Sequence, residues 1–117
     1  MAQKTIDELF SKEKALERVS GLPRSYKLVL FSILAGEKNP ILTSAVHKNY
    51  EQFCQSKNFK QLTKRRISGI ISELSSMGLL QTKTISLGRY GRMRELLFEK
   101  KDIKDATKSY LKNELSI

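Results

Sequence analysis

The stretch from residue 63 to 77 constrains the fold most, because it joins a basic start to apolar side chains at helical spacing. At about 100° per residue, its large apolar side chains fall on one face of a helix. They are Ile67, Ile70, Ile71, Leu74 and Met77. Gly78 follows, and a glycine in this place is typical of a left-handed helix end. The sequence therefore predicts a helix over 63–77 that is buried along one side.

The opposite face of this helix is small and carries no charge except arginine. It consists of Arg65, Ser68, Gly69, Ser72 and Ser76, and the helix opens on Lys64, Arg65 and Arg66. An ordinary solvated face more often carries Lys and Glu at helical spacing, whereas here Glu73 is the single acid, on the flank. A small face with cations at its start can approach phosphates closely. We therefore interpret residues 63–77 as a DNA recognition helix.

The residues that follow predict a β-hairpin with a cationic tip. Thr and Ile are frequent from 79 to 87, the second strand is expected over Met-Arg-Glu-Leu-Leu-Phe-Glu at 93–99, and glycines 88 and 91 bracket the turn. Arg89, Tyr90 and Arg92 form the tip, and Arg94 follows on the second strand. Arginines at such a tip suit the narrow, electronegative minor groove of A·T-rich DNA. We expect the hairpin to read the shape of DNA more than its bases.

The rest of the chain predicts helices before and after this core. A capping box at 5–8 starts a helix over about 6–19, and Leu22-Pro23 starts a buried helix that ends at Gly36. A very short strand at 41–42 precedes a third helix, capped by Thr43 or Ser44 and ending near 57–58. A final helix starts at Asp102. The predicted fold is α+β and mostly helical: a winged helix-turn-helix with a C-terminal β-hairpin wing and flanking terminal helices.

The net positive charge of the chain favours a polyanionic binding partner. The formal net charge is +10, from 22 Lys and Arg against 12 Asp and Glu, which points to nucleic acid or an anionic membrane. Residues 1–19 are neutral in sum, whereas residues 63–94 carry seven bases against Glu73 alone, a net of +6. The excess therefore lies in the predicted helix and wing.

Other classes of protein are disfavoured. The longest apolar run, 28–31, is far shorter than the roughly 20 residues of a membrane helix, so we expect a soluble protein with no membrane partner. A single cysteine, Cys54, fits a reducing compartment, and we expect a cytoplasmic, nucleoid-associated location. The one histidine, His47, has no cysteine or carboxylate at metal spacing, and no catalytic set is evident. We expect neither an enzyme nor a metal site in this chain.

Several segments together resemble a known family. They are Leu22-Pro23 with 27–30, Arg65-Arg66-Ile67-Ser68 with 70–74, Gly78-Leu79-Leu80, and Gly88-Arg89-Tyr90-Gly91-Arg92. The chain resembles, over about 22–98, the C-terminal winged-helix domain of archaeal origin-recognition and cell-division-control initiator proteins. The resemblance implies binding of double-stranded origin DNA, with the recognition helix in the major groove and the wing in the minor groove. It also implies the replicative helicase as a partner.

Family members carry an ATPase module ahead of this domain. This chain has no Gly-x4-Gly-Lys-Ser/Thr phosphate loop, so ATP and Mg²⁺ are expected only in a module outside it. We therefore expect a C-terminal fragment, in which residues 1–21 form a helix and linker from the preceding module. Residues 22–117 are then the winged-helix domain with its C-terminal helix, expected to be a monomer in isolation.

The candidate DNA-binding residues differ in their expected chemical roles. Arg65 can reach guanine O6 and N7, while Lys64 and one arginine anchor the phosphate backbone. Ser68 and Ser72 can donate to bases or phosphates. The predicted DNA-binding set is Lys64, Arg65, Arg66, Ser68, Ser72, Arg89, Tyr90, Arg92 and Arg94. Three alternatives remain open: these cations and serines serve only solubility or packing, the domain is a transcription regulator, or it is a protein-binding winged helix that recruits the helicase.

Overall fold

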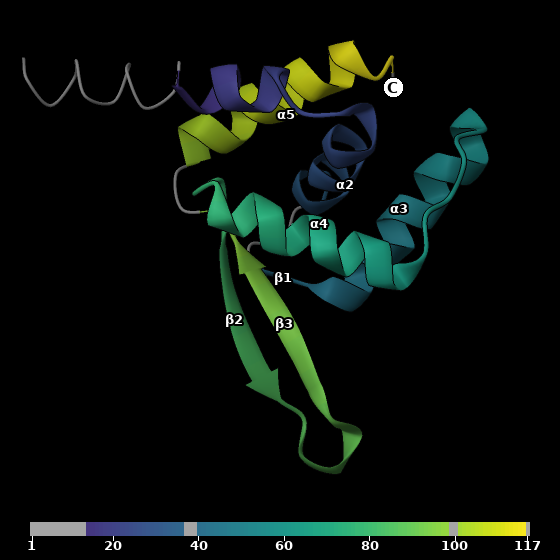
Figure 1. The fold of residues 1–117 in the computed structure, drawn as a ribbon, viewed down its shortest axis with the longest axis vertical. Coiled ribbons are helices and arrows are strands. Elements are labelled where there is room, and N and C mark those ends of the chain that lie inside the picture. The colour runs from purple at the N-terminus through teal and green to yellow at the C-terminus, as the bar shows by residue number, and fades with distance from the viewer. Residues whose placement is uncertain (1–13, 37–39, 99–100, 117) are drawn as a thin grey trace, which may run out of the picture.

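The computed structural model describes residues 14–36, 40–98 and 101–116 (Figure 1). A helical segment over 14–20 comes first. It is followed by α2 (Arg24–Leu34), β1 (Ile41–Leu42), α3 (Thr43–Lys57), α4 (Lys64–Ser76), β2 (Gln81–Ser86), a 3-10 turn (Gly88–Tyr90), β3 (Arg92–Leu97) and α5 (Lys101–Glu114). The predicted winged-helix fold is confirmed. Residues 63–77 form the predicted helix to within one residue at each end.

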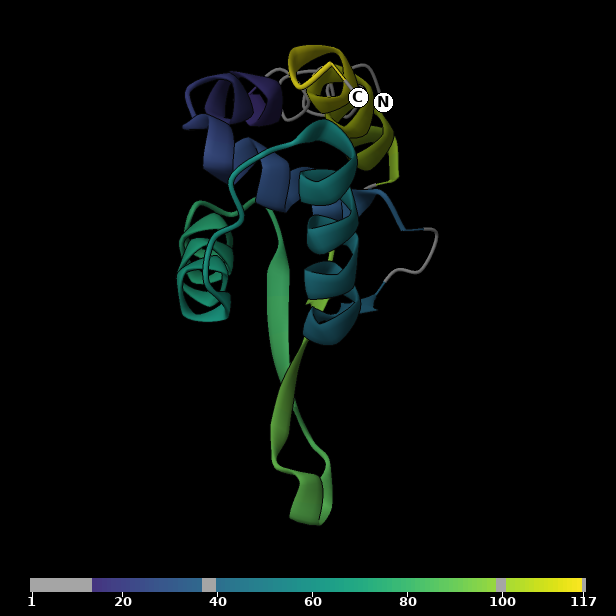
Figure 2. The same ribbon diagram turned by 90° about the vertical axis from the view of Figure 1, so that its right-hand side faces the viewer.

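The three strands form an antiparallel sheet in the order β1-β3-β2. β1 pairs with the end of β3, with Ile41 opposite Leu96, so the predicted short strand at 41–42 anchors the base of the hairpin. β2 is almost entirely exposed, because the hairpin projects away from the helices (Figures 1 and 2). The molecule measures 49 × 36 × 23 Å, and the hairpin lies along the longest axis. The wing is tied to the core at its base by β1 and along β3 by side-chain contacts with α3 and α4.

The core is built around α2, which packs against α3, α4 and α5. Eight consecutive residues of this helix, 27–34, are buried. α3 contributes Val46, Tyr50 and Cys54, and α4 contributes Ile67, Ile70, Ile71 and Leu74 as predicted. Because the large apolar residues of four helices meet here, the orientation of α4 is set by burial on α2.

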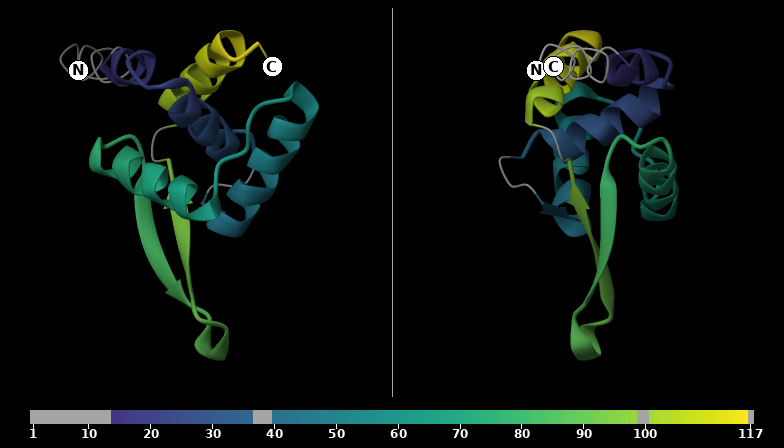
Figure 3. Two further views of the ribbon diagram at one scale, coloured as in Figure 1. Left: turned by 45° about the vertical axis from the view of Figure 1, so that its right-hand side comes forward. Right: turned by 90° about the vertical axis from the view of Figure 1, so that its left-hand side faces the viewer.

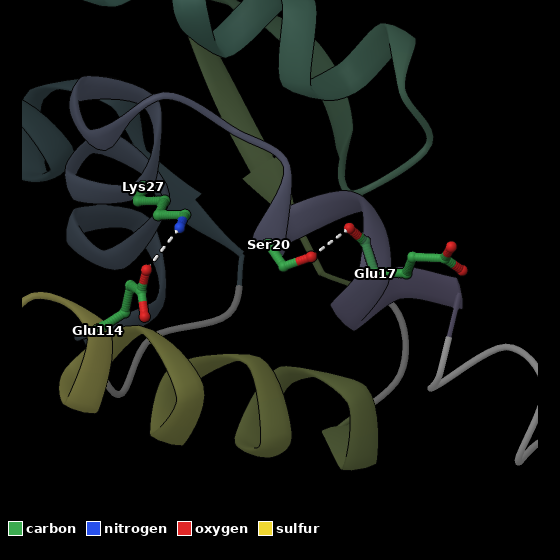
Figure 4. A network of polar contacts seen from close by, with 4 residues as sticks. All are labelled: Glu17, Ser20, Lys27 and Glu114. Carbon is green, nitrogen blue, oxygen red and sulfur yellow. Dashed lines mark hydrogen bonds and ion pairs between the residues drawn. The ribbon is translucent and has the colours of Figure 1, made fainter.

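A buried charge joins α2 to α5. Lys27 of α2 is 7% exposed, and its ammonium donates to a carboxylate oxygen of Glu114 of α5 at 3.0 Å (Figure 4). This bond raises the pKa of Lys27 against the opposing effect of burial.

In the same view, Ser20 donates to the carbonyl of Glu17 at 2.7 Å, at the end of the first helical segment. The helical segment 14–20 and α5 lie on the side of the domain away from the hairpin (Figure 3).

The helix ends agree with prediction except at the start of α3. α3 ends at Asn58, which has φ 59°, and α4 is followed by Gly78 with φ 79°. The predicted cap of α3 by Thr43 or Ser44 is wrong: Leu42 occupies the capping position, without a side-chain bond. Because 41–42 pair with β3, the chain passes directly from strand to helix, and Thr43 is already helical. The part of the predicted helix over 6–13 lies outside the described residues.

Candidate nucleic-acid interface

The outward face of α4 is small and open around Gly69. The Thr63 side chain caps the helix by accepting from the amide of Arg66 at 3.2 Å. Lys64, Arg65 and Arg66 are exposed on the first turn. A Cβ added at Gly69 would meet no atom within 4 Å, so the part of the face around this glycine is uncovered among the described residues. The face predicted to approach a polyanion is therefore accessible.

Arg66 is held partly against the domain by Tyr26 of α2. Its guanidinium donates to the Tyr26 hydroxyl at 3.4 Å and lies 5.6 Å from the ring centre. The same hydroxyl donates to the carboxylate of Glu73, about two turns further along the same side of α4. This bond raises the pKa of Tyr26, while Arg66 opposes the rise. The network explains the single acid on α4: Glu73 bonds α2 and leaves the outward face free of negative charge.

Both terminal nitrogens of the Arg94 guanidinium, on β3, donate hydrogen bonds to α4. One nitrogen donates to the Ser72 hydroxyl at 2.8 Å, and the other donates to the Ser68 carbonyl at 3.0 Å. The Ser72 hydroxyl in turn donates to the Ser68 carbonyl at 3.2 Å. Three predicted DNA-binding residues therefore come together, but in this structure they bond to one another. Whether each also contacts DNA stays a prediction.

The wing tip is a tight cationic turn. The amide of Leu87 donates to the carbonyl of Gly91 at 2.8 Å, and Gly88 and Gly91 have φ of 63° and 92°, a region that favours glycine. Arg89 and Arg92 are exposed here. The prediction for the Tyr90 side chain lies outside what the structure describes.

Four of the predicted cations have no internal partner among the described residues. Lys64, Arg65, Arg89 and Arg92 make no hydrogen bond or ion pair within the part of the chain that the structure describes. Cations left without a protein partner keep their full capacity to meet an external anion. In Figures 1 and 3, α4 lies across the base of the hairpin.

Two contacts that sequence reasoning missed fix the ends of α4. Arg18 donates to the carbonyl of Met77 at 2.7 Å, at the last turn. Before the first turn, the amide of Leu62 donates to the buried hydroxyl of Tyr50 at 3.1 Å. No sequence signal identified either pair, because each joins elements that are separate along the chain.

His47 of α3 lies close enough to Lys64 of α4 and Arg94 of β3 for their charges to act on it. It is half-buried, and its Nδ1 is buried without a hydrogen-bond partner among the described residues. Burial lowers the pKa of His47 first, and the charges of Lys64 and Arg94 lower it further, whereas Glu51 opposes them. These effects indicate a neutral imidazole in a locally positive environment.

Among the described residues, no group of three or more His, Cys, Asp or Glu side chains is placed to hold a metal ion. A search of the same residues finds no helix with both the length and the hydropathy to cross a membrane. The features that stand out are the two cationic protrusions, α4 and the wing.

Comparison with known proteins identifies relatives of the whole domain. The family model described as CDC6, C terminal winged helix domain, matches residues 17–107. The ORC1-type DNA replication protein 1 of Aeropyrum pernix is 37% identical over 87 residues, which are 73% of this chain and 22% of that protein. The ORC1-type DNA replication protein of Thermococcus kodakarensis is 34% identical over 92 residues, 76% of this chain and 22% of that protein.

A solved structure agrees with these relatives. The structure of the Aeropyrum pernix ORC1 protein in complex with DNA matches with a TM-score of 0.82 and 30% identity, over 96% of this chain and 29% of that one. The chain spans about a fifth of the length of the curated relatives it matches. The resemblance to archaeal initiators found in the sequence is therefore confirmed, and this chain belongs to the family of CDC6 C-terminal winged-helix domains, homologous to archaeal ORC1-type DNA replication proteins.

Proposed function

We propose that this domain binds double-stranded DNA at replication origins, with α4 in the major groove and the wing in the adjacent minor groove. The observation that carries the proposal is the pair of exposed cationic protrusions, α4 and the hairpin tip, whose cations Lys64, Arg65, Arg89 and Arg92 have no partner among the described residues. Support comes also from the related Aeropyrum pernix protein, whose structure was solved in complex with DNA.

α4 supplies both anchoring and base recognition in this proposal. Its first turn presents Lys64, Arg65 and Arg66, where the helix dipole also favours phosphate. Arg65 reaches a guanine through O6 and N7, the most frequent specific arginine contact. The open face at Gly69 lets the helix lie deep in a groove about 12 Å wide.

The wing supplies contacts that depend on groove shape. Arg89 and Arg92 lie on an exposed turn that projects beyond the body of the domain. A cationic tip of this size fits the narrow minor groove, whose negative potential is greatest in A·T-rich sequence. Tyr90 belongs to the same predicted contact set.

Origin binding and its wider setting rest on the family. The relatives are DNA replication proteins by name, and this chain matches only about a fifth of their length. We propose that residues 22–117 are the DNA-binding unit and that residues 1–21 link it to a preceding module. An ATPase that uses ATP and Mg²⁺ would lie in that module, and the replicative helicase would be a protein partner. The function places the protein on the nucleoid.

Selection of duplexes from a random pool, followed by salt titration of the winners, tests the proposal. Neutralising about five phosphates predicts that log K falls against log salt with a slope of about −4 to −5. Winners that match inverted origin repeats support an initiator, whereas promoter operators indicate a transcription regulator. A slope shallower than about −2 rejects the footprint and favours a protein-binding role.

A matched control is available on α5. Lys112 is exposed on the helix that lies away from the hairpin, so Lys112→Ala removes one cation without touching the proposed interface. We expect its salt slope to equal that of the wild type. An equal fall in slope for Lys112→Ala and Arg92→Ala would mean that net charge alone, and not the two protrusions, drives binding.

A further inference from the structure

We infer that Arg94 is a positioning residue that sets the angle between the recognition helix and the wing, instead of being primarily a phosphate contact. This inference rests on the proposed function, because it concerns how two DNA-binding protrusions are held relative to each other. It starts from Arg94, which lies on β3 opposite Thr84 of β2 and turns its side chain onto α4.

The two acceptors of Arg94 lie one helical turn apart on α4. The Ser72 hydroxyl is 2.8 Å from one guanidinium nitrogen, and the Ser68 carbonyl is 3.0 Å from the other. A planar guanidinium holds two acceptors at a fixed spacing and orientation, which an ammonium group cannot do. The contact therefore fixes both the distance and the rotation of α4 relative to β3.

Other connections between these elements leave that angle less constrained. α4 packs on α2 through its apolar face, whereas the chain passes from α4 to β2 through residues 77–80. The hairpin is anchored at its base through β1, and the Ser44 hydroxyl of α3 donates to the Met93 sulfur at 3.6 Å, which ties β3 to α3 but not to α4. Arg94, three residues after the tip glycine, thus braces β3 against the centre of the recognition helix.

Spacing between the protrusions decides which DNA they can bind together. α4 and the wing tip must enter neighbouring grooves in register, and a misplaced helix loses base contacts while phosphate contacts adapt. A brace of this kind acts on sequence preference more than on total charge. The sequence pattern placed Arg94 in the predicted DNA-binding set, because the pattern shows charge and not where the side chain turns.

The test uses charge-preserving variants. Arg94→Lys keeps the cation but loses the fork, and Ser72→Ala keeps the helix but removes one acceptor. Affinity is measured for the two single variants and for the double variant that combines them. Each is tested with the selected duplex and with a scrambled duplex across salt concentrations. We expect each single variant to lower the ratio of the two affinities about tenfold, the cost of about one mismatched base pair. The double variant should lose no more than either single variant, and the salt slope should not change.

Lys112→Arg is the control, because it also exchanges one cation for another and Lys112 is exposed on α5, on the side of the domain away from the wing. It should keep both preference and slope. Two results would overturn the inference. In the first, Arg94→Lys binds both duplexes like the wild type. In the second, the losses of Arg94→Lys and Ser72→Ala multiply in the double variant. Either would mark Arg94 and Ser72 as separate DNA contacts.

A readout without DNA separates this inference from the proposed function. In NMR spectra of the free protein, Arg94→Lys should shift the amides of residues 68–72, and Ser72→Ala should shift the Arg94 Nε–H signal. If the wild type bound no duplex, the proposed function would fail, and these spectra would still decide whether the brace exists. Unmoved signals in both variants would show that it does not. Unfolding midpoints near the wild-type value establish that the variants are folded.

Discussion

Arg18 donates a hydrogen bond to the main-chain carbonyl of Met77 at 2.7 Å, so a residue ahead of the winged-helix core closes the last turn of the recognition helix. A cation at a helix C-terminus also interacts favourably with the helix dipole. The end of α4 is thus tied to the helical segment 14–20, and the position of one depends on the other.

Replacing Arg18 by Ala should therefore weaken the end of α4. We expect the free energy of unfolding to fall by about 0.5–1 kcal/mol, the typical range for a charge at a helix end. Urea unfolding followed by circular dichroism measures this loss, and Arg18→Lys, which keeps the charge, should recover part of it. Equal stability of Arg18→Ala and the wild type would show that the contact contributes nothing.

Tyr50→Phe should destabilise the loop before α4. Tyr50 is 1% exposed, and its hydroxyl accepts the hydrogen bond of the Leu62 amide. Removing the hydroxyl leaves a backbone donor without its partner, which costs about 1–3 kcal/mol when the donor is shielded from water. Hydrogen exchange at the Leu62 amide should accelerate together with the fall in the unfolding midpoint. Slow exchange at that amide in the variant would contradict this role for Tyr50.

Stability should depend on pH through His47. Its folded-state pKa is lowered from the ordinary value of 6.5 by burial and by Lys64 and Arg94, with Glu51 opposing them. The unfolded chain then binds more protons than the folded one below pH 6.5, so stability is complete above this pH and decreases as pH falls. His47 is the sole histidine, so one imidazole signal in an NMR titration reports its pKa. His47→Gln should flatten this pH dependence, and a midpoint at or above 6.5 would contradict the expectation.

Replacing Arg65 and replacing Arg89 should reduce DNA binding in different ways. Arg65→Ala removes the proposed guanine contact and should cost about 1–3 kcal/mol on a preferred site, with base preference lost at one position. Arg89→Ala should weaken binding to many sequences and reduce the salt slope by about 1. Binding assays against a panel of single-base variants separate the two patterns. Equal losses on every sequence for both variants would refute the division of labour.

Gly69→Ala should stabilise the free domain. The added methyl group would meet no atom within 4 Å, and alanine in an exposed helix interior is favoured over glycine by about 0.5–1 kcal/mol. Thermal unfolding of the free protein measures the gain. Because the same methyl group would face the bound groove, affinity for the selected duplex should fall while stability rises. A variant whose affinity for the duplex does not fall would place Gly69 away from the DNA.

Patterns local in sequence predicted the elements well. The apolar stripe of α4, the left-handed stop at Gly78 and the turn near Gly88 were all recognisable, because each depends on neighbours within a few residues. The cap of α3 was predicted wrongly, because pairing of 41–42 with β3 overrode the local preference of Thr43. That pairing joins segments more than 50 residues apart and leaves no mark near Thr43.

Side-chain contacts between elements were beyond the sequence. Arg94 and Ser72 are 22 residues apart, and Tyr26 and Glu73 are 47 apart, so their meeting depends on how the helices and sheet pack. The sequence identified which residues carry charge and which are small. It did not distinguish cations that bind the protein itself, such as Arg94, from those that stay available, such as Arg65 and Arg89.

The central position of α2 has an evolutionary consequence. Residues 27–34 are buried, because this helix supports α3, α4 and α5 together, whereas the tip of the hairpin projects away from the helices. A substitution in α2 would disturb three neighbours at once, while one at the hairpin tip would disturb none of them. Divergence among homologues should therefore accumulate fastest in the wing and slowest in α2, so that new binding preferences arise on an unchanged scaffold.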